Sequence, residues 1–166
     1  MLQAHAGIAM QNQHILRPLG SIALCGALGL ALLGATGGDA VNPADTQFTQ
    51  QAMHMLLQSV ANADVAESGG DANVKSVAST IQNDEIAIGN QLGSLASFYG
   101  ISVSTDSPKA STDATGYASS QEQSLQALIS VFQNEEQAGG GAQLRAFASQ
   151  SLPVLQKDLH ALQQSS

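Results

Sequence analysis

Apolar side chains recur at steps of three and four residues through most of the chain after residue 41, which is the spacing of one buried face on an α-helix. The clearest series lies in residues 71–99, where the in-phase positions are Val74, Ala78, Ile81, Glu85, Ile88, Leu92, Leu95 and Tyr99. We therefore expect a bundle helix there, about seven turns long.

Three other segments show the same periodicity. Residues 42–69 open with Asn42, Pro43 and Asp45, a combination typical of a helix start, and their in-phase positions are Phe48, Ala52, Met55, Ser59 and then Ala63 or Ala66. Residues 113–137 have in-phase Tyr117, Gln121, Leu125, Leu128 and Phe132. Residues 142–164 have Leu144, Phe147, Ala148, Ser151, Leu155, Asp158 or Leu159, and Leu162. Glycines separate these segments, so we expect four helices.

The four segments predict an all-α fold, an up-down-up-down antiparallel four-helix bundle that forms a single domain of residues 41–166. The longest connection, residues 101–112, contains Pro108 and many Ser and Thr residues, which indicates a loop. A domain of this size can bury a core without disulfides or structural metals.

Residues 1–40 have the pattern of a secretory signal peptide. Arg17 precedes an uncharged apolar run at residues 19–33, and small residues dominate positions 34–40. We expect cleavage after Gly37 or after Ala40, and either Met1 or Met10 fits as the start. The run is shorter than the ~20 apolar residues of a membrane span, so we expect no transmembrane segment in the mature chain.

Composition narrows the range of partners. The chain has 13 acidic residues against 5 basic ones, a formal net charge of -8. A negative surface without Lys or Arg clusters repels phosphate backbones, so we expect no nucleic-acid partner. The only cysteine, Cys25, lies in the predicted signal peptide.

Glu85 is the strongest candidate for a functional residue, because it occupies one of the in-phase positions of residues 71–99, where a buried, apolar side chain is expected. A buried acid must be paired, bind a metal or hold a proton. In an antiparallel bundle Glu85 lies near the level of Ser59, Leu125 and Asp158, which predicts a polar layer across the centre.

Two interpretations of this layer remain open. One is a carboxylate site for a divalent metal, with Asp84, Glu85 and Asp158 as its ligands. The other, which we favour, has no cofactor: Glu85 turns to solvent or pairs with Lys75, Lys157 or a core hydroxyl.

Other candidate groups give little sign of catalysis. His54 and His160 each lie one place off a seam, so we expect both to face water. There is no Gly-x-Ser-x-Gly motif and no cysteine after residue 40. The sequence therefore favours a protein that is not an enzyme, and no catalytic residue is proposed from it.

The sequences of the four predicted helices resemble those of a known family, the bacterial exported, ferritin-like "domain of unknown function 4142", whose members are often described as outer-membrane proteins. The resemblance lies in Phe48-Thr-Gln-Gln-Ala, in Val74-Lys-Ser-Val-Ala followed by Asp84, in Tyr117 to Phe132, and above all in Ser151-Leu-Pro-Val-Leu155. It implies a ferritin-like bundle. The family's inward acid and histidines align with Ser59, Asp84 and Glu85, Leu125 and Asp158, so its histidines are missing here.

These observations lead to one main functional expectation and one alternative. We expect a periplasmic or secreted bundle, with association to the outer membrane left open, that has a non-catalytic binding or envelope-maintenance role. A small ligand or an envelope component would be its partner. The alternative is a ferritin-like metal-binding or redox protein that uses the central carboxylates.

Overall fold

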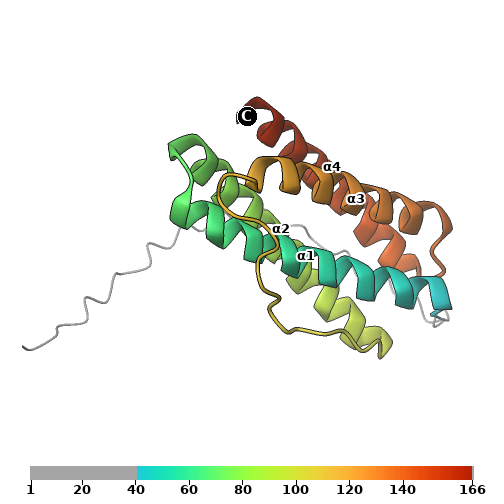
Figure 1. Cartoon of the computed structure of the whole chain (residues 1–166). Coiled ribbons are helices and arrows are strands. Elements are labelled where there is room, and N and C mark those ends of the chain that lie inside the picture. Colours follow the sequence, from blue (N-terminus) through green and yellow to red (C-terminus); the bar gives the residue numbers. More distant parts are fainter. Residues whose placement is uncertain (1–40, 166) are drawn as a thin grey trace, which may run out of the picture. The chain divides into compact units, whose positions relative to one another are not determined.

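The computed structural model describes residues 41–165 of the chain, which form four helices and no strand (Figure 1). They are α1 (Pro43–Gly69), α2 (Ala72–Tyr99), α3 (Tyr117–Ala138) and α4 (Ala142–Ser165). The predicted all-α four-helix bundle is confirmed. The predicted signal peptide and Cys25 lie outside the described residues.

Local sequence accounts for where the first two helices begin. The Asn42 side chain accepts a hydrogen bond from the Asp45 amide at 2.9 Å, and the Asp45 carboxylate accepts one from the Asn42 amide at 2.8 Å. This reciprocal capping box satisfies two amides that a helix start leaves without partners. Asp71 caps α2 in the same sense, because its carboxylate accepts bonds from the Asn73 and Val74 amides.

The start of α3 differs from the prediction. Residues 113–116 form a turn, in which the Asp113 carboxylate accepts a hydrogen bond from the Gly116 amide at 2.8 Å, and the helix begins at Tyr117. Local bonding of an Asp side chain to the backbone competes with helix formation, which explains the later start.

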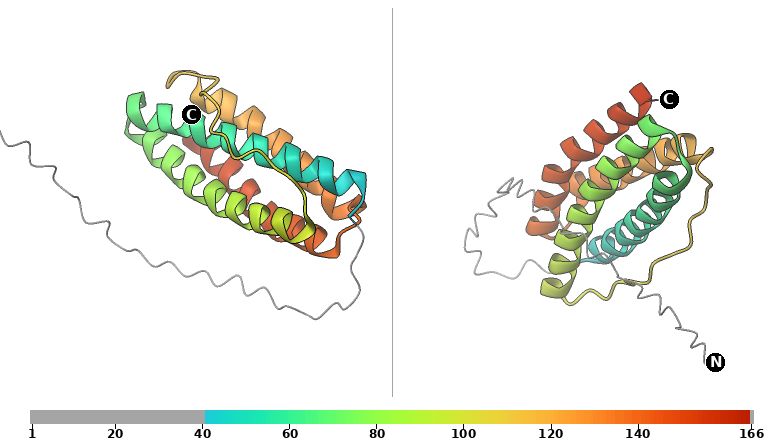
Figure 2. Two further views of the ribbon diagram at one scale, coloured as in Figure 1. Left: turned by 90° about the horizontal axis from the view of Figure 1, so that it is seen from below. Right: turned by 90° about the vertical axis from the view of Figure 1, so that its left-hand side faces the viewer.

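The order of helix directions also differs from the prediction. α2 and α3 are joined by a long crossover, residues 100–116, that runs back along α1 (Figures 1 and 2). Successive residues of the crossover contact successive residues of α1, so the two segments run in the same direction. Gln50 binds the Ser102 carbonyl, Gln58 the Lys109 carbonyl, and Asn62 the Ser111 amide. The directions in chain order are therefore up, down, down, up, and the predicted up-down-up-down order is wrong.

The length of the crossover makes this arrangement feasible. Extended chain covers roughly 3.3 Å per residue, so 17 residues reach about 56 Å, whereas the 28-residue α2 is about 42 Å long. All four neighbouring pairs remain antiparallel, with α1 packed against α2 and α3, and α4 against the same two helices. One long crossover is also the connectivity of ferritin-like bundles.

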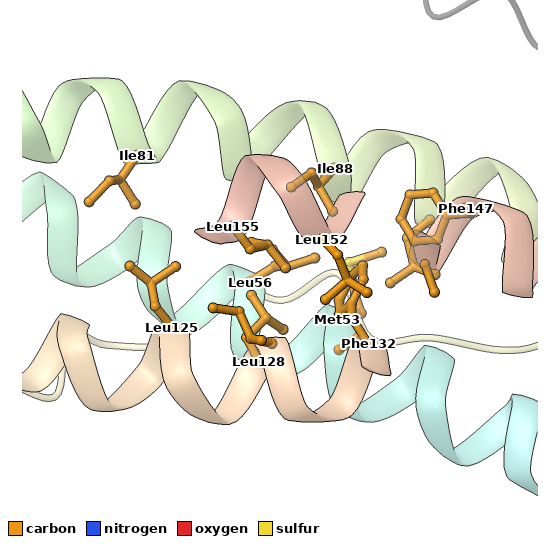
Figure 3. Close-up of a cluster of buried hydrophobic side chains, with 14 of the residues drawn as sticks. Met53, Leu56, Ile81, Ile88, Leu125, Leu128, Phe132, Phe147, Leu152 and Leu155 are labelled. Carbon is orange, nitrogen blue, oxygen red and sulfur yellow. The ribbon is translucent and has the colours of Figure 1, made fainter. Parts of the chain in front are cut away.

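The core fills the space between the four helices. Figure 3 shows apolar side chains from every helix pointing into it, among them Leu56, Ile88, Leu128 and Leu155, which are all buried. Phe132 makes edge or tilted ring contacts with Phe48 and Phe147, at centroid distances of 5.2 and 5.6 Å.

Most residues predicted to lie on the buried face of each helix do so, but in α1 Met53 takes the buried position predicted for Met55. Met53 is 6% exposed, whereas the predicted Met55 is only half-buried. Of the two alternatives in α4, Asp158 is fully buried and Leu159 half-buried. Among residues 41–165, no helix combines the length and apolarity that a membrane crossing requires.

Candidate functional site

The predicted central polar layer forms around Glu85, which is 1% exposed. The Ser59 hydroxyl of α1 donates a hydrogen bond to Glu85 Oε2, and the Gln121 amide of α3 donates to Glu85 Oε1 at 3.2 Å. The same Gln121 amide nitrogen also donates to Ser59 Oγ. Glu85 therefore pairs with a core hydroxyl, one of the two outcomes expected without a metal, and does not turn to solvent.

Burial has a strong effect on the acidity of this carboxyl. Desolvation raises the pKa of Glu85 to about 8, the Ser59 bond opposes this, and the nearby charge of Asp158 adds to it. Glu85 is therefore largely protonated at neutral pH. The pKa of Tyr117, which is buried beside this layer, is also raised, first by burial and then by the negative charge of Glu85.

Asp158 and Asp84 lie on the α2–α4 side of the layer but in different surroundings. Asp158 is fully buried, while the Asp84 side chain is 31% exposed and binds Lys157 Nζ at 2.6 Å. Lys157 Nζ lies 3.6 Å from Asp158 Oδ1. Burial, followed by the charge of Asp84, raises the pKa of Asp158 to about 7. The bond to Asp84 raises the pKa of Lys157.

Several oxygens of this layer are buried and have no hydrogen-bond partner among the described residues. They are both carboxylate oxygens of Asp158, the Tyr117 hydroxyl and the Gln121 carbonyl oxygen. Buried polar atoms of this kind normally have a partner, which can be water or an ion. Within residues 41–165, no group of three or more His, Cys, Asp and Glu side chains is arranged to hold a metal ion.

The residues proposed from sequence are thus brought together only in part. Glu85 and Asp158 are buried close enough for the charge of one to affect the other, whereas Asp84 points outward to Lys157. Leu125 is buried one turn beyond Gln121, which supplies the polar contact from α3. His54 and His160 are exposed, as expected.

A second buried carboxylate pair joins α1 to the turn between α3 and α4. Asp45 accepts hydrogen bonds from the Gly140 amide at 2.7 Å and the Gly141 amide at 3.1 Å, and it is hydrogen-bonded to Glu135. Glu135 is 3% exposed. Arg145 Nη1 donates to the carbonyls of Gly139 and Gly140, which holds the turn around this pair.

The two acids of this pair respond to burial in opposite ways. Burial, then the charge of Asp45 and the hydrogen bond that Glu135 donates to it, raise the pKa of Glu135 to about 7. For Asp45, burial also raises the pKa, but the backbone bonds from Asn42, Gly141 and Gly140 outweigh it and the net shift is downward. Glu135 therefore holds the proton between them, and the pair acts as a structural clamp on the start of α1.

Sequence reasoning missed this pair, although one signal was available. The α3 seam of Tyr117, Gln121, Leu125, Leu128 and Phe132 advances in steps of three and four, and its next position is Glu135.

A groove of about 420 Å³ runs along the outer side of the α1–α2 pair. α1 lines it with Met53, Leu56, Leu57 and Val60, and the crossover borders it at Thr105. α2 supplies two glycines one turn apart, Gly89 and Gly93, together with Asn90, Ser94 and Ser97. The half-exposed Ile86 and the buried Glu85 also line it. A smaller hollow of about 210 Å³ lies between α1 and α3 and reaches Glu135.

The fold and the site define a class: an antiparallel four-helix bundle with one long crossover and a buried, carboxylate-containing layer. Residues 31–164 match the model of a protein family described as a domain of unknown function, DUF4142. The match covers most of the chain, which therefore belongs to this family. No curated protein and no solved structure matches the chain.

Proposed function

We propose that this protein is a non-catalytic binding protein of the bacterial cell envelope, and that the groove between α1 and α2 is its binding site. One observation carries the proposal: the groove has the volume and the lining of a small-molecule site. Such sites usually enclose about 300–1,000 Å³, with mainly apolar walls and a few polar groups. Here, a half-open groove of about 420 Å³ is bordered by apolar side chains of α1 and by glycines and small polar residues of α2.

The two glycines leave part of the α2 wall of this groove free of side chains. A Cβ atom placed on Gly89 would meet no other heavy atom within 4 Å, and one placed on Gly93 would meet only the Met53 methyl at 3.7 Å. Glycine inside a helix costs roughly 1 kcal/mol relative to alanine, so its presence at two successive turns needs a reason. Keeping space open for a ligand is such a reason.

Binding can be tested with N-phenyl-1-naphthylamine, an uncharged probe whose fluorescence rises in apolar surroundings. We expect saturable binding by the wild-type protein and at least about tenfold weaker binding by Gly89→Leu, which fills the groove. Ala87→Leu adds the same side chain at an exposed position of α2 that does not line the groove, and should bind like wild type. Absence of saturable binding, or equal binding by Gly89→Leu, would contradict the proposal.

The location in the envelope has its own support and its own test. Arg17, the apolar run of residues 19–33 and the small residues that follow favour export and cleavage. Mass spectrometry of the protein recovered from a bacterial periplasm should find a chain that starts at Gly38 or Val41. A chain that retains its first 37 residues and stays in the cytoplasm would reject this part of the proposal.

A second candidate function is binding of a hard divalent cation by the central layer, with or without redox chemistry. The observation that favours it is the set of buried oxygens without a protein partner in residues 41–165, above all the Asp158 carboxylate. Oxygen ligands suit Mg²⁺, Ca²⁺ or Mn²⁺. Glu85 and Asp158 would be the ligands, while Asp84 would have to leave Lys157 to join them.

Metal analysis after dialysis against each cation separates this candidate from the first. About one equivalent of metal in the wild type, lost in Asp158→Asn, would favour the cation site. No retained metal from any of the three solutions would reject it and would leave the groove proposal untouched.

A further inference from the structure

Charged residues are absent from the two chain segments that form most of the α1–α2 groove. Residues 46–63 of α1, and residues 86–105 at the end of α2 and the start of the crossover, contain no Asp, Glu, Lys or Arg. Among the described residues that line the groove, Glu85 is the only ionisable one, and it is 1% exposed, with its oxygens bonded to Ser59 and Gln121. The groove therefore offers no accessible partner to the charge of an ionised ligand.

Two serines on the α2 side give the groove a polar edge of one kind. Ser94 and Ser97 are exposed and line the groove. The Ser94 hydroxyl donates to the Asn90 carbonyl at 3.0 Å, and the Ser97 hydroxyl donates to the Gly93 carbonyl at 2.9 Å. A hydroxyl group has one proton to donate and two lone pairs with which to accept. Because each proton is already used within the helix, these two oxygens can only accept a hydrogen bond from a ligand.

The serines lie at the end of the groove where α2 passes Met53. A Cβ atom placed on Gly93 would be 3.7 Å from the Met53 methyl group, and Ser94 and Ser97 follow Gly93 within about one turn. Leu57, one turn further along α1, continues the apolar wall away from this end. The groove thus has hydrogen-bond acceptors at one end and apolar side chains beyond them.

We propose that the groove binds an uncharged apolar molecule that carries a hydroxyl group, with the hydroxyl donating to Ser94 or Ser97 and the apolar part packed along Met53, Leu57 and Val60. The inference rests on the proposed function, since it names the ligand class of the same groove. An ionised head group would lose water without gaining a partner, or would stay in water and keep part of its chain out of the groove. An uncharged group without a donor would leave the serine oxygens to water.

Displacement of N-phenyl-1-naphthylamine by four eight-carbon ligands tests the inference. 1-Octanol and heptyl methyl ether are isomers, and only the alcohol can donate a hydrogen bond. We expect 1-octanol to displace the probe at about threefold to tenfold lower concentration than the ether, which corresponds to roughly 0.6–1.4 kcal/mol, the net value of one hydrogen bond. Octanoate and octylamine, both ionised at pH 7, should each need about tenfold more than 1-octanol. Octylamine is the sharper comparison, since general attraction to an acidic protein would favour it.

Serine variants assign the alcohol preference to one edge of the groove. The double variant Ser94→Ala/Ser97→Ala should displace the probe equally with 1-octanol and with heptyl methyl ether. Ser130→Ala is the matched control and should keep the preference, because Ser130 is also exposed and donates to the Gln126 carbonyl at 2.9 Å, but lies on α3 and does not line the groove. Circular dichroism confirms that each variant is folded, and the probe titration confirms that each still has a groove.

A further variant tests the role of the missing charge. Asn90→Asp introduces a carboxylate of nearly the same shape at an exposed position of the groove lining. Octylamine should then improve by about threefold relative to 1-octanol, the effect of one exposed ion pair. An unchanged ratio would show that the head group does not lie on this side of the groove and would overturn the inference.

The outcomes distinguish this inference from the proposed function. Probe binding with no advantage of 1-octanol over the ether, or with octylamine at least as strong as 1-octanol, would overturn the inference and leave the proposed function intact. An alcohol preference that survives the loss of both serines, or disappears in Ser130→Ala, would also overturn it. No probe binding at all would overturn both.

Discussion

At the scale of single residues, two glycines differ in how much room a side chain would have: Gly139, at the end of α3, has none, and Gly89, within α2, has ample room. A Cβ atom on Gly139 would lie 2.2 Å from Glu135 Oε1 and 2.7 Å from the Glu135 carbonyl oxygen. Gly139 therefore allows the α3–α4 turn to close over the buried Asp45–Glu135 pair. Gly89, by contrast, faces the open groove of α1 and α2.

We predict that alanine at these two positions changes stability in opposite directions. Gly139→Ala should lower the free energy of unfolding by about 1–3 kcal/mol, because it overpacks a turn held by several hydrogen bonds. Gly89→Ala should raise it by up to ~1 kcal/mol, because alanine is the better helix former and nothing obstructs its methyl group. Urea unfolding of both variants measures this, and equal effects would show that the turn is not tightly packed.

The buried acids predict how stability depends on pH. Burial raises the pKa of Glu85 to about 8 in the folded protein, above its ordinary value near 4.5. The folded state therefore holds this proton more tightly than the unfolded state. Its contribution is fully present below about pH 4.5 and is lost as pH rises towards about 8. Glu135 and Asp158, with pKa values raised to about 7, act in the same sense.

We predict that Glu85→Gln flattens this pH dependence. Between pH 5 and 8 the wild-type protein should lose stability with rising pH, and Glu85 alone accounts for at most about 1.4 kcal/mol per pH unit. The glutamine variant lacks that loss. The difference in the free energy of unfolding, variant minus wild type, should therefore be more favourable to the variant at pH 8 than at pH 5. Denaturant midpoints at four pH values measure both slopes, and parallel slopes would mean that Glu85 does not hold a proton in the folded state.

At the scale of helices and connections, apolar residues hold the start of the crossover and polar contacts with α1 hold the rest of it. Asn62 is 1% exposed, and its side-chain oxygen accepts bonds from the Ser111 amide at 2.8 Å and from Gln58 at 3.2 Å. Gln50 makes only an exposed bond, to the Ser102 carbonyl. At the start of the crossover, Ile101 is 8% exposed and packs into the core, so the polar bonds of Asn62 matter most at the end near α3.

Removing the Asn62 side chain should loosen the crossover. We expect Asn62→Ala to reduce stability by about 1–3 kcal/mol, since the Ser111 amide loses its bond and a buried space is left. Hydrogen exchange at residues 109–112 should accelerate more than exchange in α1. Gln50→Ala is the matched control and should have little effect, so similar acceleration in both variants would contradict this role of Asn62.

The helices could be predicted from sequence far better than the connection between them. Periodicity identifies a buried face because the same apolar contacts that create the pattern also stabilise the helix, as with Ile81, Ile88 and Leu92. Glu85 was found for the same reason, as an acid in an apolar series. The direction of α3 depends instead on where residues 100–116 lie. The hydrogen bond that Gln58 donates to that segment and those that Asn62 accepts from it produce no periodic pattern in the sequence.

The Asp45–Glu135 pair was missed for a related reason. Asp45 has an adequate local role in the capping box with Asn42, which explains its presence without any distant partner. Its contacts with the Gly140 and Gly141 amides join positions 95 and 96 residues apart. Such a contact depends on the packed bundle and cannot be read from neighbouring residues.

At the scale of the whole molecule, the two carboxylate layers have different roles. The Asp45–Glu135 pair fastens one end of the bundle; backbone amides bind both Asp45 oxygens, while Glu135 Oε1 is the one oxygen of the pair without a partner among the described residues. The central layer leaves several oxygens without protein partners among the described residues and reaches the groove at Glu85. Residues that function needs often leave polar groups imperfectly satisfied, so the central layer is the better place to look for binding.

The central claim is that the α1–α2 groove is where this protein binds its ligand, and amide chemical-shift mapping during titration with N-phenyl-1-naphthylamine tests it most directly. The account predicts that the largest saturable shifts occur at Gly89, Gly93, Leu57 and Val60, and that Gly89→Leu abolishes them. Shifts that instead centre on Phe98, which is 67% exposed near the end of α2, or that spread evenly over the bundle, would contradict it.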